Sequence, residues 1–496
     1  MDDASTRLTR RSFGVFGAAT LAAPSARADK SPSADALRGD GDLVQRAYEA
    51  LHSGLYRYNT PAQMRARFDT LRGELAASAS APDWQASAYL ALSRLTAQVR
   101  CGHTYANFYN QPDAVQWRLF EGTNRLPCEF RWLDGDMVVT RDLSAEQALP
   151  RGTRIVAIDG VPSPVLLQRL LPLARADGSN DAKRVALLEL QGLEKFETFD
   201  VFVGLSMPQL SQAVPLDVML PDGARRALRL RPLSYAQRLA ARKVPASDAY
   251  AGWRFDLDDS AIAVLRMPDW ALYDSKWDWK AFIADAFGEL SRTPRRALVI
   301  DLRGNEGGLD VGDEILPYLA AGPIDVTVAP RLVRYRDVPA DLERFLHTWD
   351  ASFRHWGADA RRVDERFFEL RSDGEADGHV RIVPRAPRFA GRVFVLIGPD
   401  NSSATFQFAE RVRAAGVATL VGRPTGGNRR GINGGAFFFL RLPASALEVD
   451  LPLIARFPAG DPPDAGLLPD VAVTPTIRDL ADGVDLEMAA VRKLLA

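Results

Sequence analysis

Two short segments in the second half of the chain combine the residue types that nucleophilic catalysis requires. The segment Asp301–Gly308, which reads Asp-Leu-Arg-Gly-Asn-Glu-Gly-Gly, directly follows an apolar run and ends in a glycine-rich turn. The segment Ser402–Thr405, which reads Ser-Ser-Ala-Thr, follows another apolar run and the turn Gly-Pro-Asp-Asn. Glycine N–H groups can approach a ligand closely, and a serine at a strand-to-helix turn is exposed for attack. The two segments together predict an oxyanion hole and a nucleophile.

Each segment also has a simpler interpretation. Asp301–Gly308 could be a mere tight turn, or it could hold a phosphate at a helix N-terminus. Its glycine spacing matches neither GxGxxG nor GxxxxGK[ST], which argues against a nucleotide site. Ser402–Thr405 taken alone could be an ordinary helix N-cap, because serine and asparagine are favoured there. The catalytic interpretation therefore depends on both segments acting together.

A serine nucleophile needs a general base that is uncharged near neutral pH. No lysine lies between Lys280 and Lys493, so none is close to Ser402–Thr405 in the sequence. Arginine stays protonated and is excluded as a base. Histidine is the usual alternative. The chain has five histidines, which are His52, His103, His347, His355 and His379.

The pattern along the chain predicts three regions that would position these residues. Residues 29–125 carry apolar side chains mostly at three- and four-residue spacing, which predicts an N-terminal helical domain. Residues 126–235 show short strands and turns, which predict a β domain. Apolar strands alternate with amphipathic helices in residues 250–496. This alternation predicts an α/β core, interrupted by a charged, irregular insertion at about 331–387.

The composition indicates a globular protein of balanced charge. The 496 residues are 47% hydrophobic, and 62 basic against 63 acidic residues leave a formal net charge of −1. That length suffices for about three domains with sizeable cores. The balanced charge argues against a nucleic acid, or an anionic membrane, as a partner held by bulk electrostatic attraction.

The N-terminus has the features of a targeting segment. Thr9–Phe13 contains a twin-arginine pair, Gly14–Ala23 is mildly apolar, and Ala26–Ala28 is a small-x-small cleavage site. Residues 1–28 are therefore expected to be a twin-arginine signal peptide, and the mature protein is expected to be periplasmic or secreted. No other segment approaches the apolar length of a membrane span, so stable membrane insertion is not expected.

The chain has two cysteines, Cys101 and Cys128. In an oxidising compartment they could form a disulfide worth about 3–4 kcal/mol, or they could be two buried thiols. Cys101 could also act as a nucleophile with His103, but no oxyanion motif adjoins this pair. The histidines are scattered and no HExxH or CxxC motif is present, so neither a metal site nor a cofactor is predicted.

The order of the motifs resembles that of a known peptidase family. Asp301–Gly308 and Ser402–Thr405 are followed by Val421–Gly427, which reads Val-Gly-Arg-Pro-Thr-Gly-Gly, and by Pro462–Asp470, which is similar to a Gly-x-x-Pro-Asp ending. In this respect the sequence resembles the carboxyl-terminal processing (tail-specific) serine peptidases and the tricorn core proteases. The strand and Asp-Gly turn at Leu149–Pro162 resemble part of a PDZ domain. The resemblance implies an α/β fold with a crotonase-like (ClpP-type) catalytic core, an N-terminal helical domain and a PDZ-like β domain.

The same resemblance implies roles for four residues near the two motifs. Ser403 takes the position of the nucleophile. The backbone N–H groups of Ala404 and of Gly307 or Gly308 would form the oxyanion hole, which stabilises the charge that develops on the attacked carbonyl oxygen.

The implied base departs from the processing peptidases, in which a lysine follows the serine. The matching position here is Asn428. The tricorn-like branch instead uses a histidine in a short motif far N-terminal of the serine, and Gly102–Thr104 resembles that motif, so His103 is the expected base. An acid near the terminal motif would orient the histidine, and both Asp464 and Asp461 are candidates.

These inferences lead to an expected function. The protein should be a serine-type peptidase, a hydrolase that cleaves peptides or unfolded proteins through an acyl-enzyme with a Ser-His arrangement. One alternative is a catalytically inactive protein of the same fold that binds peptides or hydrophobic ligands. Another is a scaffold that binds peptide tails through the PDZ-like domain alone.

Overall fold

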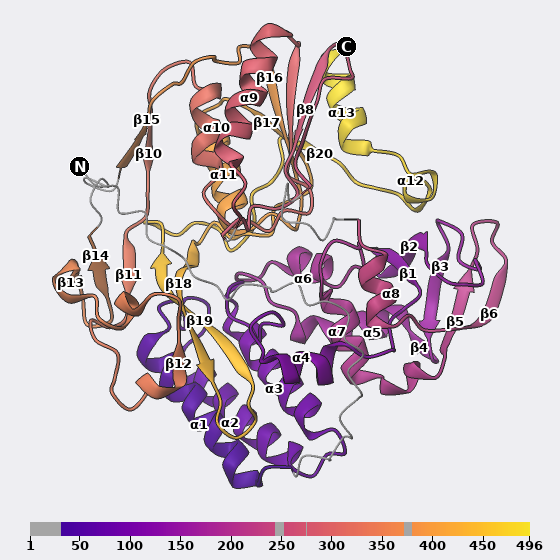
Figure 1. The fold of residues 1–496 in the computed structure, drawn as a ribbon, viewed down its shortest axis with the longest axis vertical. Coiled ribbons are helices and arrows are strands. Elements are labelled where there is room, and N and C mark those ends of the chain that lie inside the picture. Colours follow the sequence, from indigo (N-terminus) through magenta and orange to yellow (C-terminus); the bar gives the residue numbers. More distant parts are fainter. Residues whose placement is uncertain (1–30, 244–251, 274, 372–378) are drawn as a thin grey trace.

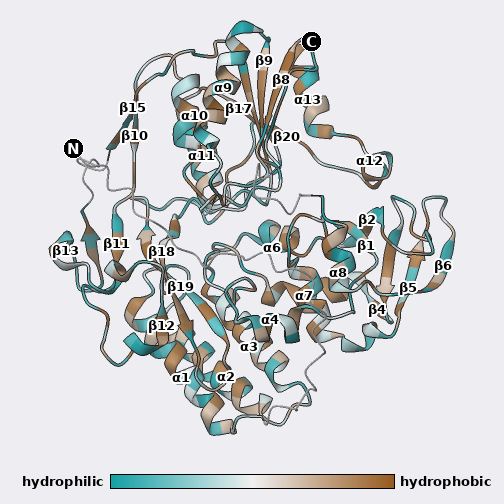
Figure 2. Ribbon diagram, in the orientation of Figure 1, coloured by the Kyte–Doolittle hydropathy of each residue, from teal (hydrophilic) through white to brown (hydrophobic). Residues whose placement is uncertain are grey.

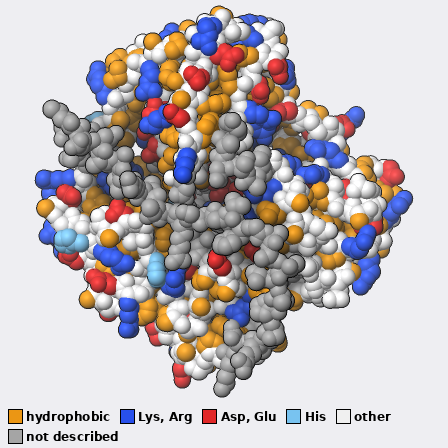
Figure 3. Space-filling view, in the orientation of Figure 1, with side chains coloured by type: hydrophobic (Ala, Val, Ile, Leu, Met, Phe, Trp, Pro, Cys, Tyr) orange, Lys and Arg blue, Asp and Glu red, His pale blue; other side chains and the backbone are white. Residues whose placement is uncertain are grey.

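The computed structural model describes residues 31–243, 252–273, 275–371 and 379–496 (Figure 1). The expected signal peptide, residues 1–28, lies outside the described residues. Within the described part of the chain, no helix is both long and apolar enough to cross a membrane. Charged side chains of both signs are interspersed over the face shown in Figure 3, in line with the balanced net charge.

The N-terminal region is helical, as its apolar spacing predicts. Its helices are α1 (Ala34–Leu51), α2 (Pro61–Ser78), α3 (Trp84–Val99) and α4 (Asp113–Phe120). The start of α2 shows how the sequence sets a boundary. Thr60 and Gln63 form a capping box there, and proline occupies the first turn, where its missing N–H costs nothing. The last turn of α3 ends at Arg100 in the left-handed conformation, which turns the chain toward Cys101 and His103.

The second region is built on an antiparallel sheet. Its strands are β1 (Cys128–Leu133), β2 (Asp136–Asp142), β3 (Arg154–Ile158), β4 (Val161–Pro162), β5 (Val214–Met219) and β6 (Arg225–Leu230), in the order β1-β2-β3-β5-β6 with β4 beside β3. The accompanying helices are α5 (Ser163–Leu170), α6 (Asp181–Leu187), α7 (Thr198–Ser206) and α8 (Tyr235–Ala240), with short 3₁₀ turns at Leu171–Leu173 and Pro208–Ser211.

The third region contains a mostly parallel sheet in the order β20-β17-β16-β9-β8-β7. Its strands are β7 (Arg254–Asp256), β8 (Ile262–Arg266), β9 (Ala297–Asp301), β16 (Arg392–Ile397), β17 (Thr419–Gly422) and β20 (Val471–Ala472), of which β7 alone is antiparallel to its neighbour. The sheet is covered on both faces, and this confirms the predicted α/β class. One face carries α9 (Trp279–Arg292), α10 (Gly312–Leu319) and α11 (Ser403–Ala414), and the other carries α13 (Leu486–Leu495) (Figures 1 and 2).

A second sheet in this region departs from the simple alternation. Its order is β12-β18-β19-β11-β14-β13, with β11 (Arg331–Val333), β12 (Leu346–His347), β13 (Ala360–Arg362), β14 (Phe368–Leu370), β18 (Ile432–Arg441) and β19 (Glu448–Arg456). Side chains of this sheet share one hydrophobic core with α1, α2 and α3. The charged stretch 331–387 thus contributes short strands and 3₁₀ turns, including β15 (His379–Ile382), which pairs with β10 (Ile324–Thr327). A short helix, α12 (Ile477–Asp482), precedes α13.

Candidate active site

The two sequence motifs leave the same edge of the parallel sheet. β9 and β16 are neighbouring parallel strands with Asp301 opposite Leu396, so both carboxyl ends lie together. The carboxyl edge of a parallel sheet is where ligands bind in α/β folds. Asn401 fastens the two turns to each other, since its Nδ2 donates to the carbonyl of Leu302 at 2.6 Å and to that of Asn305 at 3.0 Å.

Ser403 begins α11 in an unusual backbone conformation. Its φ is +52°, a region that few non-glycine residues occupy and that costs conformational energy. The preceding Ser402 does not cap the helix with its side chain; its hydroxyl donates to the carbonyl of Glu306 at 3.1 Å. Ser403 is only partly exposed, and it lines the main cavity of the described structure. A strained, presented serine between a strand and a helix is the geometry of a nucleophile rather than of a simple cap.

Gly307 packs directly against this serine. A Cβ atom on Gly307 would lie 2.8 Å from the Cβ of Ser403 and 3.0 Å from the amide nitrogen of Ala404. Gly307 also has a φ of +105°, so both space and conformation require glycine there. A Cβ on Gly308 would collide with the carbonyl oxygen of Trp270, 2.1 Å away. The glycine pair therefore brings the turn after β9 into contact with the start of α11.

The sequence does not say whether the N–H of Gly307 or that of Gly308 would bind the oxyanion, but the hydrogen bonds of the structure do distinguish them. The Gly307 N–H donates to Oδ1 of Asn305 at 2.9 Å and is already engaged. Among the described residues, no acceptor is found for the N–H of Gly308 or for that of Ala404. Ala404 lies in the first turn of α11, where N–H groups have no partner within the helix and the dipole favours an anion. Gly308 and Ala404 are therefore the pair available to hold an oxyanion.

Of the five histidines, all of them described, His103 is the one that lines the cavity with Ser403. His52 is fully buried and hydrogen-bonded to Oγ1 of Thr104 at 2.7 Å, and burial lowers its pKa to about 3. His347, His355 and His379 are exposed. The structure thus brings together Ser403 and the histidine that the resemblance implies as base, although no hydrogen bond joins the two side chains.

The surroundings of His103 keep its imidazole neutral. Burial lowers the pKa of His103, while the nearby Asp177 carboxylate raises it and Arg175 lowers it. The net shift is downward from the ordinary 6.5, so the ring is uncharged at neutral pH. Nδ1 of His103 is buried and has no hydrogen-bond partner. A neutral imidazole is the form that can accept a proton from serine.

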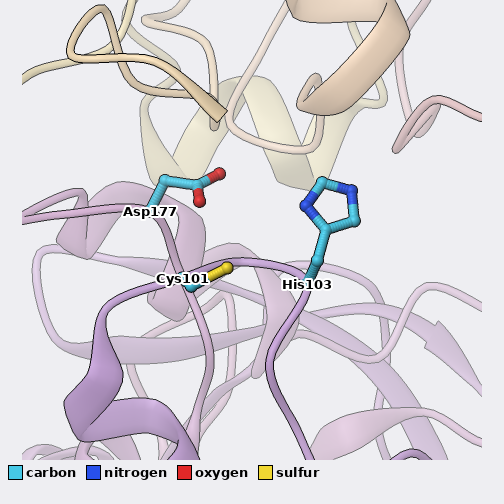
Figure 4. A group of neighbouring side chains, drawn as sticks. All are labelled: Cys101, His103 and Asp177. Atoms are coloured by element: carbon cyan, nitrogen blue, oxygen red, sulfur yellow. The ribbon is translucent and has the colours of Figure 1, made fainter. Parts of the chain in front are cut away.

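Asp177 is an acid close to His103 that sequence reasoning missed. One oxygen of Asp177, one ring nitrogen of His103 and the Sγ of Cys101 all lie within 4.8 Å of one another. The carboxylate and the thiol both point toward the side on which the His103 ring stands (Figure 4). Asp177 is buried, and its Oδ1 accepts from the Gly102 N–H at 2.7 Å. Nothing in the local sequence marks this aspartate, because only the fold brings its loop to α3.

The two acids expected near the terminal motif lie elsewhere. The Asp461 side chain is 92% exposed and pairs with Arg430 at 3.3 Å. Asp464 accepts from the N–H and the hydroxyl of Ser179, at 2.9 and 2.8 Å, and from Nδ2 of Asn428 at 2.6 Å. Neither acid is hydrogen-bonded to His103. Asp464 instead anchors the loop that carries Asp177.

Asn428, which occupies the position of the lysine in the processing peptidases, takes part in the same support. It is buried, and its Nδ2 also donates to the backbone carbonyl of Asp177 at 3.2 Å. Asn180 continues the contact by donating to the carbonyls of Thr425 and Gly427, both at 2.9 Å. The Val421–Gly427 and Pro462–Asp470 motifs therefore hold the loop around Asp177 in place.

A buried lysine does reach the site, from a distant part of the chain. Nζ of Lys183, on α6, is 3.2 Å from Oε1 of Glu306 and donates to the carbonyl of Asp400 at 2.9 Å. Arg175 contacts the other oxygen of Glu306 at 3.0 Å. Burial opposes ionisation of Glu306, but the adjacent Lys183 and Arg175 outweigh it and lower its pKa to about 2. Lys183 and Arg175 thus both contact the Glu306 carboxylate.

The main cavity has a volume of about 810 Å³ and lies where the three regions meet. Its walls include Ser403, Gly308 and His103 and a group of aromatic side chains, which are Tyr105, Phe108, Tyr109, Phe196, Tyr273, Trp349, Phe437 and Phe439. A smaller cavity of about 220 Å³ adjoins it and also touches Asp177 and Lys183. An elongated substrate with apolar side chains fits such a cleft.

Both cysteines are free and buried. Of the two alternatives drawn from the sequence, the structure has the pair of buried thiols and not the disulfide. Burial raises the pKa of Cys101 to about 12, so the thiol is protonated at neutral pH. That state does not suit a nucleophile.

A serine at a strand-to-helix junction, unengaged amides and a neutral histidine on one cavity are groups that a serine peptidase requires. Residues 261–436 match the model of peptidase family S41. Over these residues the chain is similar to the S41 peptidases, and the match supports a serine peptidase of the carboxyl-terminal processing type.

Solved structures show the same fold along most of the chain. Mature CPAF complexed with lactacystin has a TM-score of 0.62 and 13% sequence identity, over 93% of this chain and 98% of the other. A CPAF mutant has a TM-score of 0.58 and 14% identity, over 90% and 94% of the two chains. Among the curated proteins no match is found.

Proposed function

We propose that the protein is an exported serine peptidase that cleaves peptide bonds through an acyl-enzyme on Ser403, with His103 as the general base. One observation carries the proposal. A serine at positive φ, the N–H groups of Gly308 and Ala404, and a histidine whose pKa is lowered all lie on one cavity. This is the set of groups that acyl transfer requires.

The proposed reaction moves one proton between three groups. Nε2 of His103 accepts the hydroxyl proton as Oγ of Ser403 attacks the carbonyl carbon. The N–H groups of Gly308 and Ala404 hold the resulting oxyanion. His103 then gives the proton to the leaving amine, and a water molecule repeats the sequence on the ester. Because His103 and Ser403 share no hydrogen bond in the structure, a side-chain rotation or a bridging water must join them.

Asp177 is proposed as the residue that positions His103. One of its carboxylate oxygens lies within 4.8 Å of a ring nitrogen, and an acid there favours the tautomer with the proton on Nδ1 and stabilises the imidazolium that forms. The backbone around it is held by Asp464 and Asn428, so these two act on the loop and not on the histidine. Asp461 has no place in this arrangement.

Lys183 is proposed to fix the floor of the site and not to act as the base. Its Nζ contacts Oε1 of Glu306 and donates to the carbonyl of Asp400, and no hydrogen bond to Ser403 is found among the described residues. The Lys183–Glu306 contact joins the β domain to the turn after β9. It therefore supports the orientation of the glycine pair.

Three finer features are part of the proposal. The antiparallel sheet β1–β6 has the strand, Asp-Gly turn and following helix of a PDZ-like module, with the turn at Asp159 and Gly160. The parallel sheet with its helices is proposed to be a crotonase-like core. Residues 1–28 are proposed to direct export, because their order of twin arginine, apolar run and small-x-small site is that of a signal peptide.

The proposal is tested by hydrolysis of an unfolded protein such as reduced, alkylated casein. Ser403→Ala should abolish hydrolysis while the thermal unfolding profile stays unchanged. Ser402→Ala is the matched control, because it removes the neighbouring hydroxyl and its bond to the Glu306 carbonyl but leaves the nucleophile. Equal hydrolysis by wild type and Ser403→Ala would refute the nucleophile. No hydrolysis by wild type on any unfolded substrate would favour the alternative of an inactive protein that binds peptides or hydrophobic ligands.

A further inference from the structure

The Cys101, His103 and Asp177 side chains offer three different ligand atoms to one point beside the catalytic cavity. Sγ of Cys101, a ring nitrogen of His103 and a carboxylate oxygen of Asp177 lie within 4.8 Å of one another. Cys101 and His103 are two residues apart on the segment that follows α3, whereas Asp177 comes from the loop before α6 (Figure 4). Cys101 has no role in the proposed reaction, although it is buried close to His103.

One polar atom of the cluster is buried without a hydrogen-bond partner. Nδ1 of His103 is buried and has no hydrogen bond. A buried polar nitrogen without a partner costs about 1–3 kcal/mol, so such atoms call for an explanation. Two groups close to the ring, a thiol and a carboxylate, are themselves ligand types. The unpaired Nδ1 of His103 therefore indicates that a ligand binds between these three side chains.

We propose that Cys101, His103 and Asp177 form an inhibitory zinc site that blocks the peptidase by binding its base. Zn²⁺ takes sulfur, imidazole nitrogen and carboxylate oxygen together, commonly with three protein ligands and a water. Zn–S of about 2.3 Å and Zn–N of about 2.0 Å place ligand atoms about 3.3–3.8 Å apart. Side-chain shifts of about 1–1.5 Å would close the present group to that spacing. Mg²⁺ and Ca²⁺ prefer all-oxygen sites and do not fit this set.

The surroundings hold the three groups in place and balance their charge. Oδ1 of Asp177 accepts from the Gly102 N–H at 2.7 Å, and the Cys101 thiol lies 3.7 Å from the carbonyl of Asn433. The nearby cations Arg175 and Lys183 are both paired with Glu306. Lys183, Arg175, Glu306 and Asp177 line the smaller cavity, which offers a path for an ion. The two positive and two negative charges offset each other, so the site does not repel a cation.

Metal binding would change which atoms of Cys101 and His103 carry protons, and this would stop catalysis. The ion displaces the thiol proton of Cys101 to solvent and bonds to Nδ1 of His103. A neutral imidazole bound to a metal through Nδ1 carries its proton on Nε2. Nε2 then has no lone pair with which to accept the Ser403 proton. Removal of zinc by a chelator restores the base, so the inhibition is reversible.

The inhibition rests on the proposed role of His103, whereas metal binding does not, and the test separates the two. Peptide hydrolysis by the mature protein is titrated with Zn²⁺ and then with EDTA, beside Cys101→Ser and the matched control Cys128→Ser. Wild type and Cys128→Ser should be inhibited reversibly, and the inhibitory Zn²⁺ concentration for Cys101→Ser should rise at least about tenfold. Equal inhibition of Cys101→Ser and wild type would overturn the assignment, as would inhibition by Mg²⁺ at similar concentrations.

A second measurement needs neither activity nor a cysteine variant that folds. Co²⁺ added to Ser403→Ala should produce a thiolate-to-cobalt charge-transfer band and the intense visible bands of tetrahedral cobalt, both removed by Zn²⁺. Absence of the charge-transfer band would overturn the metal site whatever the protein hydrolyses. The band together with no hydrolysis by wild type would retain the site and refute the peptidase proposal instead.

Discussion

The two halves of the proposed active site are built in different ways. The nucleophile half comes from the neighbouring strands β9 and β16, whose carboxyl ends deliver Gly307, Gly308 and Ser403 to one point. The base half joins His103, after α3, to Asp177, before α6, and depends on contacts with two motifs near the C-terminus. The first half lies at one edge of one sheet, whereas the second is assembled across regions. Substitutions in the first half should therefore lower activity strongly, but only at the few residues that meet there. Activity should also be sensitive to substitutions far from the reaction where these support the second half.

The largest effect is expected from the base itself. His103→Ala should lower kcat/KM at least about 10³-fold, because removing one member of a catalytic set typically costs several orders of magnitude. His52→Gln is the matched control, a buried histidine on Thr104 whose replacement should affect stability more than rate. The measurement is kcat/KM on a fluorogenic peptide, with thermal unfolding beside it. Retention of wild-type kcat/KM in His103→Ala would move the base elsewhere.

A methyl group on Gly307 should be almost as damaging to the nucleophile half. Gly307→Ala places a Cβ 2.8 Å from that of Ser403 and forces a residue with a side chain to φ +105°, so the serine and the amides must shift. A loss of about 10²–10³ in kcat is expected, the size seen when an oxyanion donor is removed. Gly398→Ala serves as control, since nothing lies within 4 Å of its added Cβ. Similar kcat values for both variants would contradict the packing.

The structure and the sequence point to different acids as the partner of His103. The structure points to Asp177, whereas the sequence resemblance implies Asp461 or Asp464. Asp177→Asn should lower kcat about 10²-fold, less than a directly hydrogen-bonded triad aspartate, for which about 10⁴ is known. Asp461→Asn should have little effect, because its side chain is 92% exposed. Asp464→Asn should fall between them, by loosening the Ser179 contacts. An Asp461→Asn loss larger than that of Asp177→Asn would reverse the assignment.

The pH profile tests the electrostatics of the same half. Burial lowers the pKa of His103, so the neutral ring persists to lower pH than an exposed histidine. Activity should therefore rise with pH through an apparent pKa below 6.5 in kcat/KM. In Asp177→Asn the midpoint should fall further, because the carboxylate raises the pKa of His103. A midpoint well above 6.5, or an upward shift in the variant, would contradict this picture.

The smallest effect on activity is expected from substitution of Lys183, which contacts Glu306 and so joins the two halves. Lys183→Arg keeps a cation on Glu306 and should retain kcat/KM within about tenfold, since a charge-assisted contact can re-form. Lys183→Met leaves Glu306 with Arg175 alone and should lower the melting temperature more than Lys183→Arg does. If Lys183 were the base, both variants would lose activity equally, which steady-state kinetics would reveal.

The sequence predicts the nucleophile half better than the base half, for a physical reason. Apolar strands that run into Asp301–Gly308 and Ser402–Thr405 report local structure, and parallel strands bring their carboxyl ends together. Asp177 and Lys183 carry no such signal, because their loop reaches the site only through the packing of the β domain on the core. The choice between Gly307 and Gly308 also needed the structure, since the Asn305 side chain engages one of two adjacent N–H groups.

The sequence also predicts the three regions of the fold only in part, because some of their contacts are long-range. The helices of residues 29–125 follow from their spacing and caps. The joining of β18 and β19 to that helical region depends instead on long-range contacts, such as the Tyr48 hydroxyl donating to the Asp450 carbonyl at 3.1 Å. Alternation of strands and helices in 250–496 predicts the parallel sheet but not this second sheet.

The most direct test of the central claim is to locate the reactive serine. The mature protein is treated with a fluorophosphonate probe, digested, and mapped by mass spectrometry, beside Ser403→Ala and Ser402→Ala. The adduct should lie on Ser403, be absent in Ser403→Ala, and persist in Ser402→Ala. An adduct on another residue, or undiminished labelling of Ser403→Ala, would contradict the account.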